Sequence, residues 1–142
     1  MVLLIGLTGG ICSGKSTISA FFSSLGAVLL DADKLGHEAY QKDTACYLRL
    51  IEHFGTRILS NDGSIDRKVL GGIVFGDKRE MEMLQSIVWP EIRKLITEKV
   101  KEIRTDYPDS IIVVEAAILL EAKWQDLFER IIVVTGFYYV NK

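Results

Sequence analysis

Cysteine, histidine and proline are scarce in this chain of 142 residues, which has two of each. Cys12 and Cys46 are too few for a disulfide framework or a cysteine-rich zinc site, and a reducing compartment is the simpler assumption. His37 and His53 lack metal-ligand spacing and are expected at the surface or at a boundary. We therefore predict a cytoplasmic protein, and an association with mitochondria stays open.

The chain also lacks an excess of charge of one sign and any long apolar run. Its net charge of −2 gives no electrostatic case for binding nucleic acid or anionic membranes. No apolar run approaches the roughly 18 residues needed to span a bilayer. The first seven residues carry no positive charge and lead into a glycine-rich loop, so we interpret them as a strand and not as a signal peptide. A hydrophobic content of 49% favours one folded domain over disorder.

The most informative feature that is present is the stretch Gly9-Gly10-Ile11-Cys12-Ser13-Gly14-Lys15-Ser16. It fits G-x-x-x-x-G-K-[ST], the phosphate-binding P-loop. The apolar run 2–5 precedes it and predicts a buried strand, and the run 17–22 after it predicts the start of a helix. The alternative is a glycine turn before an ordinary helix, but strand, loop and Lys-Ser pair together favour a phosphate site.

The chemistry of this loop predicts ATP and Mg²⁺ as its ligands. Glycines let backbone N–H groups converge on a phosphate, and the N-terminal end of the following helix favours negative charge. Lys15 would reach the β- and γ-phosphates, and the Ser16 hydroxyl would ligate Mg²⁺. We interpret Cys12 as the small residue that the loop needs, with a reactive thiol as the alternative. The predicted nucleotide-binding residues are Gly9, Gly10, Ile11, Cys12, Ser13, Gly14, Lys15, Ser16 and Thr17.

Alternating apolar runs and helical patterns predict an α/β layered domain with a parallel sheet. We expect strands at 2–5, 28–30, 111–114 and 131–134. We expect helices at 15–25, 35–40, 45–54 and 78–88, a short helix capped by Asp66, loop and helix over 116–128, and a break or a new helix at Pro90. Pro90 suits the first position of a helix, which is why the pattern favours an interruption there.

Three carboxylates, Asp31, Asp33 and Glu115, fall at the ends of predicted strands. A P-loop kinase needs one acid to accept the proton of the attacking hydroxyl and another to help hold Mg²⁺. Glu115 follows four apolar residues, a pattern typical of the metal-supporting acid, and the aspartate pair is the better place for the base. In an extended stretch the two aspartates would face the same side and their charges could couple. The alternative is that these acids only cap helices.

These motifs together resemble the dephospho-CoA kinase family, and most closely the kinase half of animal bifunctional CoA synthases. The resemblance extends over nearly the whole chain, to about Thr135. The stretches that carry it are Gly6-Leu7-Thr8-Gly9-Gly10 with the P-loop, Leu30-Asp31-Ala32-Asp33, Phe54-Gly55, Ile65-Asp66-Arg67-Lys68-Val69-Leu70-Gly71, Val74-Phe75, Val88-Trp89-Pro90 and Glu115-Ala116-Ala117-Ile118-Leu119-Leu120-Glu121.

The resemblance implies a P-loop kinase fold in a single domain over 1–142, with a helical substrate-binding insertion at about 34–105. It implies transfer of the ATP γ-phosphoryl to the ribose 3′-hydroxyl of dephospho-CoA, with Asp33 as the general base and Lys15 as the other catalytic residue. Ser16 and Glu115 would serve Mg²⁺. Thr8, Asp33, Arg67, Trp89 and Pro90 would contact the substrate.

The chain departs from the family pattern after Thr135. Family members continue into an arginine-bearing lid and an adenine-contacting region, whereas this chain has Gly136-Phe137-Tyr138-Tyr139-Val140-Asn141-Lys142. Lid arginines that neutralise phosphoryl charge can be worth about 10³–10⁵ in rate, so we expect a C-terminally truncated form with weak or absent catalysis. Another small-molecule P-loop kinase and a non-catalytic nucleotide-binding isoform are the alternatives. The sequence leaves the oligomeric state undetermined.

Overall fold

The computed structural model describes residues 3–10 and 14–135, so the predicted ligand residues Ile11, Cys12 and Ser13 lie outside the described part. The chain forms two compact units. The first comprises Met1–Ala32 and Ile96–Lys142, and the second comprises Asp33–Leu95. The second unit starts one residue before the helical insertion expected from 34, and it ends ten residues before the expected end at 105.

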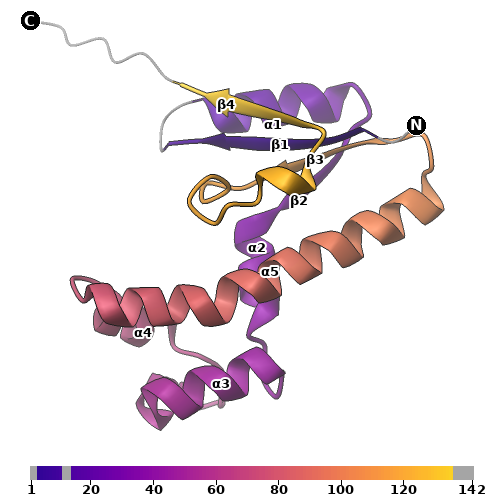
Figure 1. Ribbon diagram of the computed structural model, residues 1–142. Helices are drawn as coiled ribbons and strands as arrows, with labels where there is room; N and C mark the ends of the chain where they lie inside the picture. Colours follow the sequence, from indigo (N-terminus) through magenta and orange to yellow (C-terminus); the bar gives the residue numbers. More distant parts are fainter. Residues whose placement is uncertain (1–2, 11–13, 136–142) are drawn as a thin grey trace, which may run out of the picture. The chain divides into compact units, whose positions relative to one another are not determined.

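The first unit is built on a parallel sheet in the order β2-β3-β1-β4 (Figure 1). Its strands are β1 (Leu3–Gly9), β2 (Val28–Asp31), β3 (Ile111–Glu115) and β4 (Arg130–Val134). The expected parallel sheet is confirmed, and each strand includes most of the apolar run that predicted it. The central strands are almost continuously apolar because both of their faces are covered.

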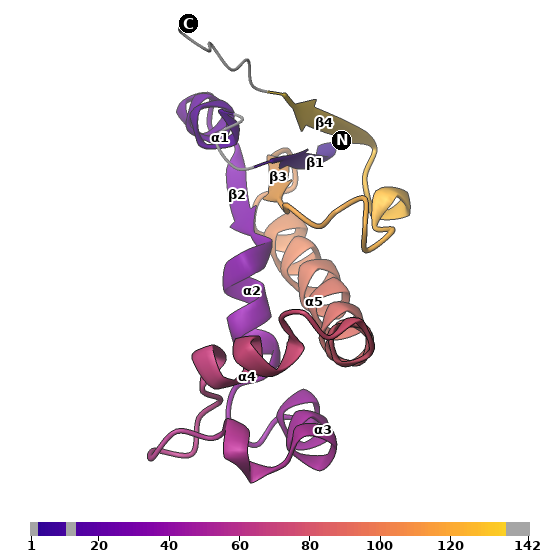
Figure 2. The ribbon, with the colours of Figure 1, turned by 90° about the vertical axis from the view of Figure 1, so that its left-hand side faces the viewer.

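Helix α1 (Lys15–Ser24) covers one face of this sheet (Figure 2). Side chains of a strand alternate between its faces, and Ile5, Leu7 and Val113 form a buried cluster against Ile18 and Phe22 of α1. The helix ends at Ser24, one residue before the expected end at 25, and Gly26 follows in the left-handed region, with φ 90° and its N–H donated to the Ser23 carbonyl.

Turns and a short 3₁₀ helix, η2 (Gln125–Leu127), lie against the opposite face. Gly6 of β1 is needed there, because a Cβ atom at this position would come within 2.6 Å of Leu119 and 2.9 Å of Phe128. The helix expected within 116–128 is therefore corrected to turns ending in a 3₁₀ helix. The chain reverses at Lys123, which has φ 59°, and this reversal buries Trp124.

The predicted interruption at Pro90 is wrong, because α5 runs unbroken for 29 residues from Lys78 to Asp106. Proline removes one N–H from the helix, and the buried residues keep a four-residue spacing on both sides of it, at Val88, Ile92, Ile96 and Val100. A continuous apolar stripe thus outweighs the local cost of Pro90, whose own side chain is exposed.

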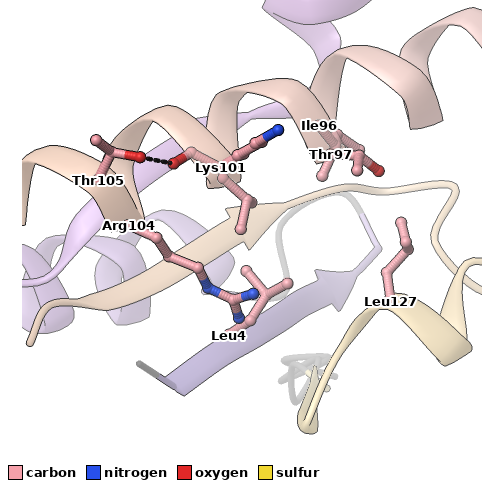
Figure 3. A pocket seen from close by; sticks show the side chains of 8 residues that line it. Leu4, Ile96, Thr97, Lys101, Arg104, Thr105 and Leu127 are labelled. Carbon is pink, nitrogen blue, oxygen red and sulfur yellow. Dashed lines mark hydrogen bonds between the residues drawn. The ribbon is translucent and has the colours of Figure 1, made fainter. Parts of the chain in front are cut away.

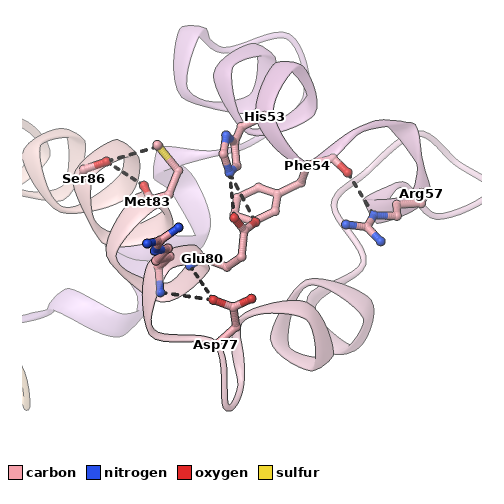
Figure 4. Close-up of polar contacts among 8 residues, drawn as sticks. His53, Phe54, Arg57, Asp77, Glu80, Met83 and Ser86 are labelled. Atoms are coloured by element: carbon pink, nitrogen blue, oxygen red, sulfur yellow. Dashed lines mark hydrogen bonds and ion pairs between the residues drawn. The ribbon is translucent and has the colours of Figure 1, made fainter.

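The second unit is helical apart from its turns. It contains α2 (Ala32–Ala39, which starts in the first unit), α3 (Ala45–Phe54), the 3₁₀ helix η1 (Thr56–Ile58), α4 (Arg67–Val74) and the first part of α5. The predicted cap at Asp66 is confirmed, because its carboxylate accepts hydrogen bonds from the N–H groups of Lys68 and Val69. Helix α3 is also joined to α5 by His53 Nε2, which lies 3.2 Å from the Glu80 carboxylate (Figure 4).

Cys46, in the second unit, is a buried residue of the core. Cys46 is 3% exposed, and its thiol donates a weak hydrogen bond to the Ile87 carbonyl at 3.8 Å. Burial, reinforced by the nearby Glu91, raises the pKa of Cys46 to about 11. The thiol therefore stays protonated near neutral pH and is not a nucleophile.

Candidate functional site

The described parts of the P-loop have the local geometry that phosphate binding requires. β1 ends at Gly9 and α1 begins at Lys15. Gly14, the N-cap residue of this helix, is in the left-handed region, with φ 91°, and has no side chain that could cap the N–H groups of the first turn. Only glycine takes this conformation without strain, and a helix start without a side-chain cap leaves backbone donors for an anion.

Glu115 lies where sequence reasoning placed a metal-supporting acid, at the carboxyl end of β3. Its Oε1 is 3.9 Å from Lys15 Nζ, and its Oε2 accepts a hydrogen bond of 2.9 Å from the Ser19 hydroxyl. The side chains of Lys15 and Glu115 are 17% and 27% exposed. The structure thus brings together a P-loop lysine and an acid that were predicted separately.

Ser19 is a member of this cluster that sequence reasoning missed. It is 6% exposed and lies one helical turn after Lys15 on α1. The signal was its spacing, four residues from the P-loop lysine, on a helix whose neighbouring Ile18 and Phe22 pack on the sheet. A buried hydroxyl needs a partner, and here the partner is the predicted metal-supporting acid.

The two aspartates do not share a strand, so the prediction that they face the same side of an extended stretch is wrong. Asp31 ends β2, while Asp33 lies in the first turn of α2 and is exposed. The chain turns directly from strand to helix at the buried Ala32. Asp31 is instead in register with Glu115 on the neighbouring strand, on the α1 side of the sheet.

The donor set at this edge suits Mg²⁺, an ion that binds proteins through one or two carboxylates and keeps several water and phosphate ligands. Ser16 is exposed on the first turn of α1 and Glu115 is part-exposed at the end of β3. Among residues 3–10 and 14–135 no cluster of three or more histidine, cysteine or acidic residues could hold a metal alone. An ion at this edge would take its remaining ligands from water or from a bound polyphosphate.

The residues predicted to contact the acceptor fall mainly in the second unit. Arg67 is the first residue of α4 and is exposed, Trp89 is part-buried in α5 and Pro90 beside it is exposed. Thr8 is the exception, because it belongs to β1, is 4% exposed and donates its hydroxyl to the Ala117 carbonyl at 3.3 Å. Substrate contact by these four residues stays a prediction.

A separate cavity of about 390 Å³ opens at the other end of the strands (Figure 3). Its walls include Leu4, Leu127, Ile96, Val100, Lys101 and Arg104. Beside it, the Glu129 carboxylate accepts a 2.8 Å hydrogen bond from the Leu4 N–H and lies 3.4 Å from Arg104. None of the predicted site residues that the structure describes lines this cavity. None of the described helices is long and apolar enough to cross a membrane.

Comparison with known proteins agrees with this geometry. The family model for dephospho-CoA kinase matches residues 3–137. A dephospho-CoA kinase from Moorella thermoacetica is 37% identical over 135 residues, which cover 95% of this chain and 64% of the relative. One from Carboxydothermus hydrogenoformans is 43% identical over 131 residues, covering 92% and 63%.

Solved structures show the same fold. A crystal structure of a Thermus thermophilus protein superposes with a TM-score of 0.74 at 29% identity, over 94% of this chain and 65% of that one. A dephospho-CoA kinase from Campylobacter jejuni gives 0.69 at 28% identity, over 93% and 66%. This chain thus spans just under two thirds of each of these relatives, and the P-loop kinase fold is confirmed. The chain belongs to the dephospho-CoA kinase family.

Proposed function

We propose that the reaction of this chain, which we expect to be slow, is transfer of the γ-phosphoryl group of ATP to the ribose 3′-hydroxyl of dephospho-CoA, giving CoA and ADP. The observation that carries the proposal is the pairing of Lys15, at the start of the P-loop helix, with Glu115 at the end of β3. Family membership supplies the acceptor, because the relatives at 37% and 43% identity are dephospho-CoA kinases. The substrate would be a small molecule and not a nucleic acid, and we place the reaction in the cytoplasm.

In this proposal the first unit binds the nucleotide. The N–H groups from Gly9 to Thr17 surround the phosphates, and Lys15 leaves Glu115 to contact the β- and γ-phosphates. Because Lys15 and Glu115 are 3.9 Å apart and part-exposed, their attraction is weak enough for a polyphosphate to compete for the lysine. Bound Mg²⁺, held by Ser16 and Glu115, would neutralise charge on the transferred group.

The general base in this proposal is Asp33. Its carboxylate accepts the proton of the 3′-hydroxyl as that oxygen bonds to the γ-phosphorus and the bond to ADP breaks. Arg67 would attract the phosphates of dephospho-CoA, and Trp89 and Pro90 would offer an apolar surface, with Thr8 near the reacting group. Asp31 stays the alternative base, since it ends the strand beside Glu115.

The test compares Asp33→Asn with Asp31→Asn, since both changes replace a carboxylate by an amide of the same size. If Asp33 is the base, we expect its substitution to lower CoA formation by about 10²–10⁴-fold with unchanged ATP affinity. Chromatography of CoA and ADP, with separate calorimetry of ATP binding, gives both quantities. The opposite ranking of the two variants would transfer the role to Asp31.

The acceptor is tested by offering dephospho-CoA alongside a panel of nucleosides and nucleotides. Transfer to dephospho-CoA alone is expected. ATP-dependent phosphorylation of a nucleoside or nucleotide would identify another small-molecule P-loop kinase. Tight ATP binding without any transfer would identify a non-catalytic nucleotide-binding protein, and either result would overturn the proposed reaction.

A further inference from the structure

We propose that Ser19 is a positioning residue, which fixes the Glu115 carboxylate so that this acid can serve Mg²⁺ after Lys15 has moved to the phosphates. The inference rests on the proposed nucleotide chemistry of the P-loop edge, and it adds a residue outside the P-loop motif. Its basis is the 2.9 Å hydrogen bond from the Ser19 hydroxyl to Glu115 Oε2.

The two carboxylate oxygens of Glu115 have different partners. Oε1 lies 3.9 Å from the Lys15 ammonium, whereas Oε2 accepts the Ser19 hydrogen. A contact of 3.9 Å to a part-exposed lysine is easily exchanged, while a hydrogen bond to a charged acceptor is short and directional. Nucleotide binding can therefore remove one partner of Glu115 and leave the other.

The burial of Ser19 makes its contact the lasting one. The residue is 6% exposed, on the side of α1 that faces the sheet. Its hydroxyl cannot exchange freely with water, so breaking the bond to Glu115 would leave a buried donor unsatisfied. Lys15 has a long side chain at the helix start that can reach a new partner, whereas the Ser19 hydroxyl is carried on a single rotatable bond and stays close to the helix.

The consequence is that Ser19 holds Oε2 and leaves Oε1 for a cation. A neutral donor orients the carboxylate without cancelling its charge, which an arginine or a lysine in the same place would do. Once Lys15 contacts phosphate, Oε1 becomes accessible to hydrated Mg²⁺ in an orientation that is already set. Preorganisation of this kind lowers the cost of binding the metal–nucleotide complex.

The experiment measures the dissociation constant of ATP at saturating Mg²⁺ and again in excess EDTA, with no acceptor present. We expect Ser19→Ala to raise the dissociation constant of ATP about fivefold to tenfold in Mg²⁺ and to leave it unchanged in EDTA. The reason is that the lost hydrogen bond, to a charged carboxylate, matters only when that carboxylate holds Mg²⁺. Ser24→Ala is the matched control. It removes a hydroxyl from the same helix, one that donates to the Phe21 carbonyl at 2.6 Å and not to Glu115.

A double-mutant cycle separates positioning from a general loss of helix stability. In the Glu115→Gln background, Ser19→Ala should add no further loss of Mg²⁺-dependent affinity. An equal loss in Mg²⁺ and in EDTA, or full additivity in the cycle, would overturn the positioning role. If Ser19→Ala does not fold, Ser19→Cys, which is close in size and a weak donor, carries the same expectation.

This experiment distinguishes the failure of Ser19 from the failure of the proposed reaction. Mg²⁺-dependent ATP binding that responds to Ser19, with no transfer to dephospho-CoA, would overturn only the reaction. CoA formation by a Ser19→Ala variant with unaltered Mg²⁺ dependence would overturn only the role of Ser19. Absence of Mg²⁺-dependent ATP binding by the unsubstituted chain would overturn both.

Discussion

The first unit holds a glutamate at each edge of its parallel sheet, and the two have nearly the same surroundings. Glu115 at the carboxyl edge accepts a hydrogen bond from the Ser19 hydroxyl and lies 3.9 Å from Lys15. Glu129 at the amino edge accepts a hydrogen bond from the Leu4 N–H and lies 3.4 Å from Arg104. Each acid therefore has one neutral donor and one cation.

The two sites differ in whether the cation has an alternative anionic partner. Lys15 is the first residue of a helix whose N-cap is a glycine, and the N-terminal end of a helix favours an anion, so an arriving phosphate offers Lys15 a better partner. Arg104 belongs to the last turns of α5, and Glu129 also donates its own N–H to the Leu4 carbonyl, which closes a two-way contact between β1 and the start of β4. At the carboxyl edge the lysine of the ion pair can exchange its glutamate for a phosphate. At the amino edge the similar ion pair stabilises the contact between elements of the fold.

Among the comparisons of the two edges, the largest difference in the rate of phosphoryl transfer is expected between the variants that remove Lys15 and Arg104. Lys15→Ala should lower phosphoryl transfer by about 10²–10³-fold, because one charged donor to the reacting phosphates is lost. Arg104→Ala should leave transfer within twofold and lower stability only slightly, since it removes a pair that is about 40% exposed. Initial rates of CoA formation and urea unfolding of both variants measure this. Comparable losses of transfer would show that the two edges are not functionally distinct.

A second test uses two glycines near the phosphate edge. Gly6→Ala should cost about 1–3 kcal/mol of unfolding free energy, because the new methyl group would collide with Leu119 and Phe128. A Cβ atom at Gly10 would meet no atom of the described residues within 4 Å, so Gly10→Ala should change stability little while ATP binding weakens about tenfold through obstruction of the phosphates. Thermal unfolding with and without ATP separates the two effects. Unfolding of Gly10→Ala at a much lower temperature than the parent would contradict the assignment of Gly10 to binding.

The smallest effect is expected on the free energy of unfolding when either of the two acids, Glu129 or Glu115, is replaced. Glu129→Ala should lower the free energy of unfolding by about 1 kcal/mol, since the Leu4 N–H loses its acceptor, and ATP affinity should not change. Glu115→Ala should lower the free energy of unfolding by a similar amount, about 1 kcal/mol, because the buried Ser19 hydroxyl loses its acceptor, but it should also lower the Mg²⁺-dependent ATP affinity. Denaturant unfolding and calorimetry in Mg²⁺ report the two quantities. A fall in ATP affinity for Glu129→Ala would contradict the assignment of Glu129 to stability alone.

Much of the fold could be predicted because its signals are local. The start of α1 at Lys15, the bounds of α3 and the cap at Asp66 all depend on residues within a few positions of each other. Pro90 and the segment 116–128 were predicted wrongly for the opposite reason. A helix continues through Pro90 because a stripe of distant core contacts favours it, and 116–128 turns because Trp124 must be buried.

Some features of the candidate site could likewise be predicted from local sequence, and others could not. The P-loop and the acid at the end of β3 were readable, since a glycine loop and an acid after an apolar run have meaning by themselves. Ser19 was not readable, because a serine in a helix is ordinary until its partner 96 positions away is known. The relation of Asp31 to Glu115 also depends on the strand order β2-β3-β1-β4, which places β3 beside β2.

The sequence by itself determined the P-loop motif, the parallel strands and the family, because glycine conformations, helix caps and apolar runs act over short stretches of chain. Only the tertiary structure decided which polar groups meet: Lys15 and Ser19 on Glu115 at one edge, Arg104 and the Leu4 N–H on Glu129 at the other. Hydrogen bonds and ion pairs act over a few ångströms in space, and strand order and register set those distances whatever the separation along the chain.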